Sequence, residues 1–296
     1  MSLRTSKFRF TAVAGFFAQD AATGPHETTT LPGLGLTSRS YETDPFFDPN
    51  HQKTEWERFA HYLDHLNKTA PENVSYKLIY AARHGQGYHN VKEAEVGTIE
   101  WERHWARLDG DGHTTWADAH LTPKGTDDAL AMKTFWELSS SNLKLPLARH
   151  HYASPLTRCL QTCSMAFTNL AVAPGVENPP FRPVIKEMIR ERLGIHTCDR
   201  RSSASVIRKA FPGFSIEEGF SEEDELWVPD VRETLGEHAV RIEAFLDFLF
   251  ENDEEQIVSV TAHSGSILAL WQVIGHEKVR VAPGGIVPVL VKAQVV

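Results

Sequence analysis

The stretch that decides the fold is YKLIYAARHGQGYHN, residues 76–90, in which an apolar run ends in an arginine and a histidine followed by two glycines. The apolar run has the length and composition of a buried β-strand. Alternation along an extended chain points Arg83 and His84 to opposite faces. We therefore expect a sharp turn, permitted by Gly85 and Gly87, to bring both side chains to one pocket.

The rest of the chain alternates short apolar runs with helical periodicity. Strand candidates lie at 76–82, 147–154, 182–186 and 256–262. Helical spacing is found at 54–68, 127–141, 156–171, 237–252 and 266–275. Strands that alternate with helices indicate a mostly parallel sheet with helices on both faces. We therefore predict an α/β fold, a three-layer sandwich, with its ligand site at the carboxyl ends of the strands.

The first 75 residues differ in character from the rest. Residues 8–12 alternate as an extended segment, and residues 20–50 are rich in Thr, Pro, Gly and Asp, which favours a long surface loop. An amphipathic helix is predicted at 54–68. We therefore expect an amino-terminal extension, residues 1–75, packed on the side of a catalytic domain that spans residues 76–296.

Composition argues against two classes of partner. The chain has 30 Lys and Arg residues against 39 Asp and Glu residues, a formal net charge of −9. Because nucleic acids and anionic membrane surfaces repel such a chain, we expect neither as a partner. A small anionic ligand remains compatible, since it responds to the local charge of its pocket. No apolar run is long enough to span a bilayer.

The cysteine and histidine patterns predict neither a disulfide framework nor a metal site. Cys159, Cys163 and Cys198 are odd in number and lack paired zinc spacing, which favours a reducing compartment. We therefore expect a cytoplasmic protein. Four further histidines lack matching carboxylate or cysteine ligands, namely His104, His113, His150 and His151. No metal and no cofactor are expected.

Charged and imidazole side chains follow the predicted strands at the points where the strands end. Arg83 and His84 end the first strand, and His263 follows the last. Arg158 lies near the start of the helix after the second strand, and Glu191 follows the third. Because the carboxyl ends of parallel strands meet at one edge of a sheet, we expect these five residues to converge.

Two arginines, two histidines and one carboxyl group suit phosphoryl transfer. The planar fork of arginine matches the oxygens of a phosphate monoester. A neutral histidine can attack phosphorus through one ring nitrogen when a carbonyl holds the proton on the other. The second histidine then stabilises charge on the equatorial oxygens. The carboxyl group can protonate the leaving oxygen and later activate water.

Further hydrogen-bond donors are expected around the phosphate. Gly85 allows backbone N–H groups to approach an anion closely, and Asn90 and Gln86 offer side-chain donors. Ser264 opens a predicted helix directly after His263, and a helix amino terminus favours anions.

Five motifs, in this order, resemble those of the histidine phosphatase superfamily, in its phosphoglycerate mutase-like branch. They are RHGQGYHN (83–90), HLTPKG (120–125), SPLTRCLQT (154–162), RERLG (190–194) and TAHSGSI (261–267). RHGQGYHN, with HTCDRR (196–201) and DELWVPDVRE (224–233), is similar in particular to the phosphomutase-like proteins of fungi and plants. The resemblance runs from about Tyr76 to the carboxyl terminus.

The resemblance implies a role for each matching residue. His84 would be the nucleophile that becomes phosphorylated, and the phosphate pocket would be completed by Arg83, Arg158 and His263. Asn90 matches the asparagine that follows the nucleophile in the same loop.

The proton donor is matched less closely. Glu191 lies where the family's proton donor is usually found, but that glutamate is often four residues before a glycine, and Gly194 is three residues away. Three other carboxylates therefore remain alternatives, namely Glu187, Asp230 and Glu233.

Net hydrolysis of a small phosphorylated metabolite is the expected reaction, and neither the substrate nor the oligomeric state is predicted. A phosphomutase is an alternative, because the insertion between about Gly194 and Leu235 decides whether water reaches the phosphohistidine. A catalytically silent phospholigand-binding protein is the alternative of another class. Ser264 after the second histidine, where the acid phosphatase branch has Asp, speaks against that branch. AHSGS lacks the later acid and histidine, on separate loops, that a serine hydrolase needs.

Overall fold

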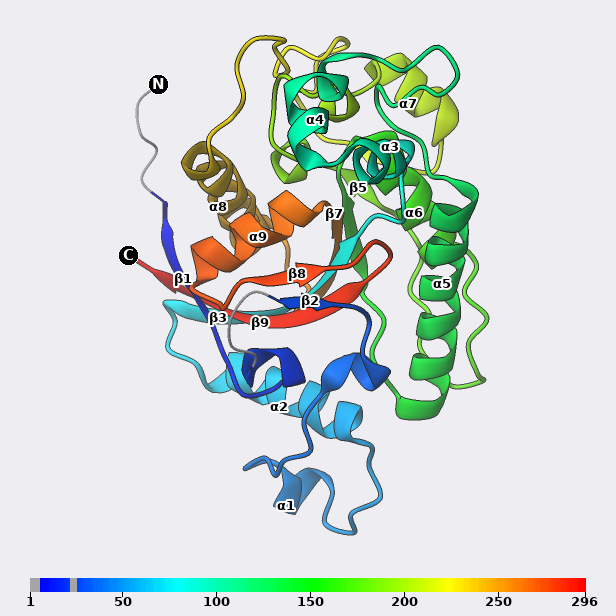
Figure 1. The fold of residues 1–296 in the computed structure, drawn as a ribbon. Coiled ribbons are helices and arrows are strands. Elements are labelled where there is room, and N and C mark those ends of the chain that lie inside the picture. Colours follow the sequence, from blue (N-terminus) through cyan, green and yellow to red (C-terminus); the bar gives the residue numbers. More distant parts are fainter. Residues whose placement is uncertain (1–5, 22–25) are drawn as a thin grey trace.

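A seven-stranded sheet forms the middle layer of the molecule (Figure 1). The computed structural model describes residues 6–21 and 26–296, and the strands lie in the order β1-β9-β3-β7-β4-β5-β6. Their bounds are β1 Phe8–Ala12, β3 Val74–Arg83, β4 His150–Ala153, β5 Val184–Ile185, β6 Ser215–Ile216, β7 Ile257–Ala262 and β9 Ile286–Val295. Neighbouring strands from β3 to β6 in this order are parallel, and β9 is antiparallel to β1 and β3. The predicted α/β fold with a mostly parallel sheet is confirmed.

Helices make the two outer layers (Figure 1). α2 (Glu55–Thr69), α5 (Pro123–Leu143) and α6 (Thr157–Phe167) share one hydrophobic cluster with the sheet. α8 (Leu235–Asn252) and α9 (Ser264–Ile274) share a second cluster with it. The helices predicted from periodicity therefore cover the faces of the sheet.

Strand β3 shows why the central strands are continuously apolar. Leu78 and Tyr80 lie in the cluster with α2, α5 and α6, whereas Ile79 and Ala81 lie in the cluster with α8 and α9. Successive side chains of a strand point to opposite faces, and a strand covered on both faces needs apolar residues at every position. The first polar residues after this run, Arg83 onward, therefore mark the edge of the sheet.

Three further helices gather where the parallel strands end. α3 (Tyr88–Val96), α4 (Thr98–Arg103) and α7 (Ala204–Ala210) lie together at that end of the molecule (Figure 1). Short 3-10 turns occur at Ala18–Ala21, Pro32–Gly35, Trp105–Arg107, Glu187–Ile189 and Thr197–Asp199. Among the described helices, none combines the length and apolar character needed to cross a bilayer.

The prediction of one continuous loop over residues 20–50 is wrong in part. β2 (His26–Thr28) pairs in parallel with β8 (Val279–Val281), and a helical turn, α1, spans Asp44–Phe47. A three-residue strand is too short to show a period of two, and its partner lies far along the chain. Residues 22–25 of this segment and residues 1–5 of the predicted extension lie outside the described residues.

Strand β9 was not predicted either. Its sequence IVPVLVKAQV contains Pro288, which lacks the N–H that a central strand donates. β1 pairs only with residues 291–295, so Pro288 lies where β9 is paired with β3 alone. The proline is tolerated there because that side of β9 has no strand to bond.

The extension contributes to the hydrophobic core. Phe17, Trp56 and Phe59 are buried in the same cluster as Tyr80 and Trp136 of the sheet and α5. Trp56 and Phe59 belong to the apolar stripe predicted for α2. Leu63 and Leu66, from the same stripe, also pack in this cluster. The domain boundary at residue 75 stays a prediction.

We predict that Phe59→Ala lowers the free energy of unfolding by about 3–5 kcal/mol, because Phe59 has no exposed surface and its removal leaves a cavity. Phe46→Ala is the matched control, since Phe46 is 92% exposed, and its effect should stay within about 0.5 kcal/mol. Urea denaturation of both variants measures the difference. Equal stability of the two variants would show that the extension does not pack as described.

Candidate active site

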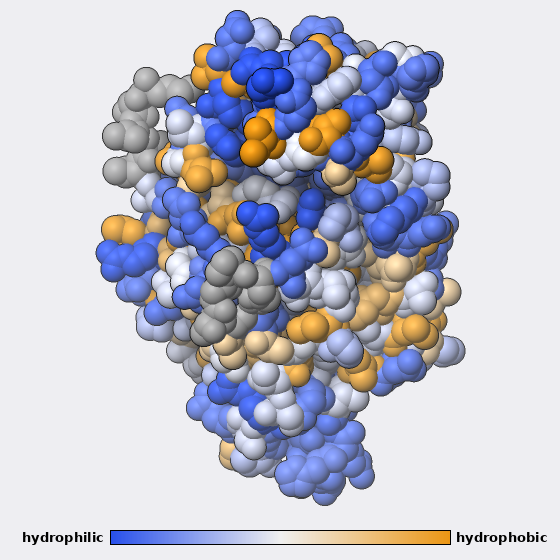
Figure 2. Space-filling model, viewed as in Figure 1, coloured by the Kyte–Doolittle hydropathy of each residue, from blue (hydrophilic) through white to orange (hydrophobic). Residues whose placement is uncertain are grey.

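A polar cleft opens at the carboxyl ends of β3 and β7. Its lining residues come from β2, β3, α3, α4, α6, α9, β8 and the insertion after β5: Glu27, Arg83, His84, His89, Asn90, Glu93, Trp101, Glu102, Arg158, Glu191, His196, Cys198, Asp199, Arg232, Ser264 and Arg280. Figure 2 shows this face hollowed beneath the part formed by α3 and α4, with hydrophilic side chains along the edge.

Two hydrogen bonds determine which ring nitrogen of His84 carries the proton. Nδ1 lies 2.7 Å from the carbonyl oxygen of Gly85, which only accepts, so Nδ1 is protonated. Nε2 lies 3.3 Å from Nε of Arg158, which only donates, so Nε2 keeps its lone pair. Burial, and then the charges of Arg158 and Arg83, lower the pKa of His84 well below its usual range. The ring is therefore neutral, with a bare Nε2.

Arg158 is held from the side opposite His84. It lies in the first turn of α6 and is 1% exposed. Nη2 donates to Oδ1 of Asp199 at 2.9 Å, and Nη1 donates to the carbonyl of Cys198. Asp199 also accepts from Arg232 at 2.9 Å. A buried guanidinium is thus fixed by a carboxylate, and its Nε faces the histidine.

Arg83 and His263 complete the basic part of the site. Nη1 of Arg83 donates to the carbonyl of Val281 at 2.8 Å, whereas its buried Nε has no partner among the described residues. His263 is fully buried beneath the cleft, with its ring centroid 5.1 Å from that of His84. Nε2 of His263 lies 2.7 Å from Oγ of Ser154. The residues expected to converge do so.

Glu191 lies in the cleft, and its carboxylate contacts the first turn of α9. Its Oε2 accepts the N–H of Gly265 at 2.8 Å, and a Cβ at Gly265 would stand 1.9 Å from Oε1. Ser266 ties the same helix to the loop, because its Oγ donates to the carbonyl of Arg190 at 2.7 Å. The glycine therefore makes room for the carboxylate.

The other candidate proton donors lie outside the cleft. Glu187 is paired with Arg190 and Arg201, and Glu233 is paired with Arg241. Asp230 is exposed and does not line the cleft. Of the four carboxylates that the sequence left open, Glu191 is the one placed beside the basic residues.

Comparisons with known proteins identify the family of this chain. Residues 79–280 match the family described as the histidine phosphatase superfamily, branch 1. The chain belongs to this superfamily. A protein of Arthroderma benhamiae named "Probable phosphoglycerate mutase" is 40% identical, over 96% of this chain and 84% of that protein. A Saccharomyces cerevisiae protein of the same name is 33% identical, over 96% of each chain. A solved phosphoglycerate mutase from Thermus thermophilus is 19% identical, with a TM-score of 0.38, over 71% of this chain and 91% of that one.

The two glycines of this histidine phosphatase loop are needed because they have no side chain, and not because they adopt left-handed backbone torsions. Neither Gly85 nor Gly87 has a positive φ, so the chain here does not use the left-handed torsions that glycine allows. A Cβ at Gly85 would stand 2.3 Å from the carbonyl oxygen of Gly125, in the first turn of α5. A Cβ at Gly87 would stand 2.7 Å from Nδ1 of His89. The glycines allow close packing against α5 and against an imidazole.

Two of the expected phosphate donors are used elsewhere. The N–H of Gly85 donates to Oγ1 of Thr162 at 3.0 Å, and the N–H of Gln86 donates to Asp128. Oε1 of Gln86 accepts from Thr122 at 2.9 Å. Neither Gly85 nor Gln86 lines the cleft, which corrects our expectation for both. They support the loop against α5.

Asn90 and Ser264 do line the cleft. Oδ1 of Asn90 accepts the N–H of Gly87 at 2.9 Å, which leaves its amide nitrogen as the group able to donate to a ligand. Ser264 is the first residue of α9, directly after His263. Their roles toward phosphate stay predictions.

Sequence reasoning missed several residues that line the cleft. His89 lies within RHGQGYHN, His196 and Asp199 lie within HTCDRR, and Arg232 lies within DELWVPDVRE. The motifs were noticed, but none of these four residues was assigned to the site. Arg232 Nη2 lies 3.1 Å from Nδ1 of His196, so the insertion after Gly194 folds back to form a wall of the cleft.

One group of the described residues has metal-ligand geometry. The ligand atoms of His196, Cys198 and Asp199 lie within 4.8 Å of one another. Both carboxylate oxygens of Asp199 already accept from arginines, Oδ1 from Arg158 and Oδ2 from Arg232. Two guanidinium charges repel a cation, so we propose no metal at this group.

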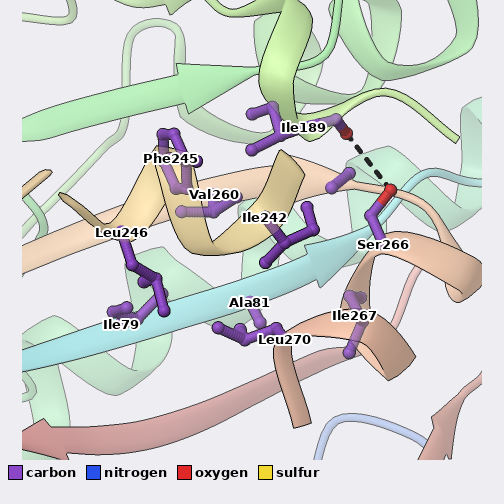
Figure 3. Close-up of a pocket in the computed structure, with 11 residues that line it drawn as sticks. Ile79, Ala81, Ile189, Ile242, Phe245, Leu246, Val260, Ser266, Ile267 and Leu270 are labelled. Carbon is purple, nitrogen blue, oxygen red and sulfur yellow. Dashed lines mark hydrogen bonds between the residues drawn. The ribbon is translucent and has the colours of Figure 1, made fainter. Parts of the chain in front are cut away.

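An apolar cavity lies behind the cleft, between the sheet, α8 and α9 (Figure 3). Ile242 and Phe245 of α8 face Ile267 and Leu270 of α9 across it. Of the 11 lining residues, all within the described chain, Ser266 alone has a polar side chain. Its Oγ donates to the backbone carbonyl of Ile189. The cavity carries no group for chemistry and belongs to the core.

We predict that Asp199→Asn lowers the free energy of unfolding at pH 7 by about 3–5 kcal/mol, because it removes the counter-charge of a buried arginine. Burial alone raises the pKa of Asp199, but Arg232 and Arg158 outweigh it and lower the pKa to about 2. The carboxylate therefore stabilises the fold above its unfolded pKa of about 3.9 and loses this effect as the pH falls toward 2.

Urea denaturation between pH 7 and pH 3 checks this. The difference between wild type and variant should shrink as the solution becomes more acidic. A difference that does not change with pH would contradict the assignment of the ion pair.

Proposed function

We propose that this protein transfers the phosphoryl group of a small phosphomonoester to His84, forming a phosphohistidine that water then hydrolyses. The observation that carries the proposal is the tautomer of His84, whose Nδ1–H is held by a carbonyl while the bare Nε2 faces the guanidinium of Arg158. A nucleophilic nitrogen and a group that binds anionic oxygens are thus adjacent. The superfamily as a whole binds small phosphorylated substrates.

The proposed reaction has two steps. In the first, the lone pair of Nε2 forms a bond to phosphorus, the bond from phosphorus to the ester oxygen breaks, and the leaving oxygen takes a proton from the Glu191 carboxyl group. In the second, water attacks the phosphohistidine and gives its proton to Glu191. Inorganic phosphate leaves, and Nε2 regains its lone pair. Arg83, Arg158 and His263 stabilise the equatorial oxygens in both steps.

The rim of the cleft is open to solvent, as hydrolysis requires. Glu27, Glu102 and Arg280 line the cleft and are themselves exposed to solvent, so water has access to the site. A mutase is the second candidate, since two relatives carry that name. Phosphate release in equal amount to ester consumed, with no phosphorylated product, distinguishes hydrolysis from transfer.

We predict that His84→Ala lowers turnover of an aryl phosphate by more than about 10³-fold, because no other group replaces the nucleophile. His120→Ala is the control, since His120 is exposed and bonds to Gln161 away from the cleft. Steady-state release of the phenol measures both variants. Substantial residual turnover in His84→Ala would contradict the proposed nucleophile.

We predict that Glu191→Gln affects poor leaving groups most. Hydrolysis of alkyl phosphates should fall by about 10²–10⁴-fold, whereas 4-nitrophenyl phosphate, whose leaving oxygen needs no proton, should be affected much less. Asp230→Asn is the control, because Asp230 is exposed and outside the cleft. The slope of log kcat/KM against leaving-group pKa is the measurement. An equal loss for all esters would show that Glu191 is not the acid.

A further inference from the structure

His89 is a buried histidine in the wall of the cleft. It lies in the first turn of α3, its side chain is 8% exposed, and its ring centroid is 5.6 Å from that of His84. It lines the cleft together with the basic residues already described. No step of the proposed reaction uses it.

The polar atoms of His89 lack partners in the described part of the chain. Nδ1 is fully buried without a hydrogen bond, and Nε2 is the ring nitrogen that remains accessible from the cleft. Nε2 has no hydrogen-bond partner among the described residues, so a ligand in the cleft is the group to which it can bond.

The backbone nearby makes room for this ring. A Cβ at Gly87 would stand 2.7 Å from Nδ1 of His89 and 2.8 Å from its Cε1. Nδ1 therefore lies against Gly87, and the opposite edge of the ring is turned away from it. Only a residue without a side chain permits the imidazole to occupy this position.

The surroundings of the ring favour one tautomer. A buried N–H without an acceptor is costlier than a lone pair without a donor, so the proton belongs on Nε2 and not on Nδ1. Burial, and then the charge of Arg158, lower the pKa of His89 well below its usual range, which keeps the ring neutral. His84 carries its proton on Nδ1, so the two neighbouring rings hold opposite tautomers.

We propose that His89 is a further phosphoryl-binding residue, which donates its Nε2–H to an oxygen of the phosphoryl group during transfer to His84. This inference rests on the proposed function. The bare Nε2 of His84 supplies the electron pair, and the Nε2–H of His89 supplies a hydrogen bond to the charge that develops on phosphoryl oxygens. A bound oxyanion thus provides the acceptor that the protein itself lacks.

The test compares two variants by inhibition with orthovanadate. His89→Leu fills the space but removes the donor, and vanadate inhibition should weaken by about 10- to 100-fold, the usual effect of losing a hydrogen bond to a charged group. His89→Gln places an amide N–H near the position of Nε2 and should recover part of this loss. Similar inhibition constants for wild type and His89→Leu would overturn the proposal.

His151→Leu is the control for loss of a buried imidazole. His151 is 5% exposed, bonds to Ser259 through Nδ1 and does not line the cleft. This variant should lower the melting temperature without changing vanadate inhibition. The proposal fails if His89→Leu and His89→Gln lose vanadate inhibition equally and if both have a melting temperature lowered as in His151→Leu. The role of His89 is then structural.

Nitrogen NMR of wild type with labelled histidine gives a readout that does not need a stable Leu variant. His89, assigned by loss of its signals in His89→Gln, should show a protonated Nε2 that shifts when vanadate is added. An Nδ1–H tautomer, or no shift at saturation, would overturn the inference for His89 alone. A wild type that neither binds vanadate nor turns over aryl phosphates would overturn the proposed function itself.

Discussion

The site depends on the buried ion pair between Arg158 and Asp199. Both side chains are almost without exposure, and an unpaired charge at either position would be strongly destabilising. The pair joins α6 to the insertion after Glu191, and Asp118 reinforces this connection, since its carboxylate accepts from Thr157 at the start of α6 and from Ser202 beyond Asp199. With the guanidinium fixed from behind, its Nε is directed at His84. The tautomer of the histidine is therefore a consequence of how distant segments pack.

The sequence predicts the strands and helices whose own residues show a clear apolar or helical pattern. The apolar run before Arg83 and the one before His263 identify β3 and β7, and because both strands are parallel their following residues must meet. The three-residue β2 and the proline-containing β9 carry no such signal, since long-range pairing alone makes them strands. The glycines of RHGQGYHN were noticed for a backbone reason, whereas the structure shows a steric one. Arg232 could not be assigned, because its place depends on how the insertion folds back.

The cleft is built from four parts of the chain. Its floor comes from the ends of β3 and β7, and one wall comes from α3 and α4. The insertion that carries His196 and Arg232 forms another wall and contacts α4, since Nε2 of His196 lies 2.9 Å from Oε2 of Glu102. The β2–β8 pair adds Glu27 and Arg280 to the rim. Glu27 lies outside the residues that match the family, so part of the rim is particular to the extension. In the proposed reaction, these rim residues would contact the part of the ester that is not transferred.

The measurement that tests this account most directly is mass spectrometry of the intact protein after a brief pulse with 4-nitrophenyl phosphate in the presence of a chelator, quenched in base to preserve phosphohistidine. The account predicts a transient phosphate adduct that maps to His84, is absent in His84→Ala and decays with release of inorganic phosphate. Turnover without an adduct on His84 would contradict the mechanism. Bound phosphate with neither adduct nor turnover would show that the same cleft serves a binding protein and not an enzyme.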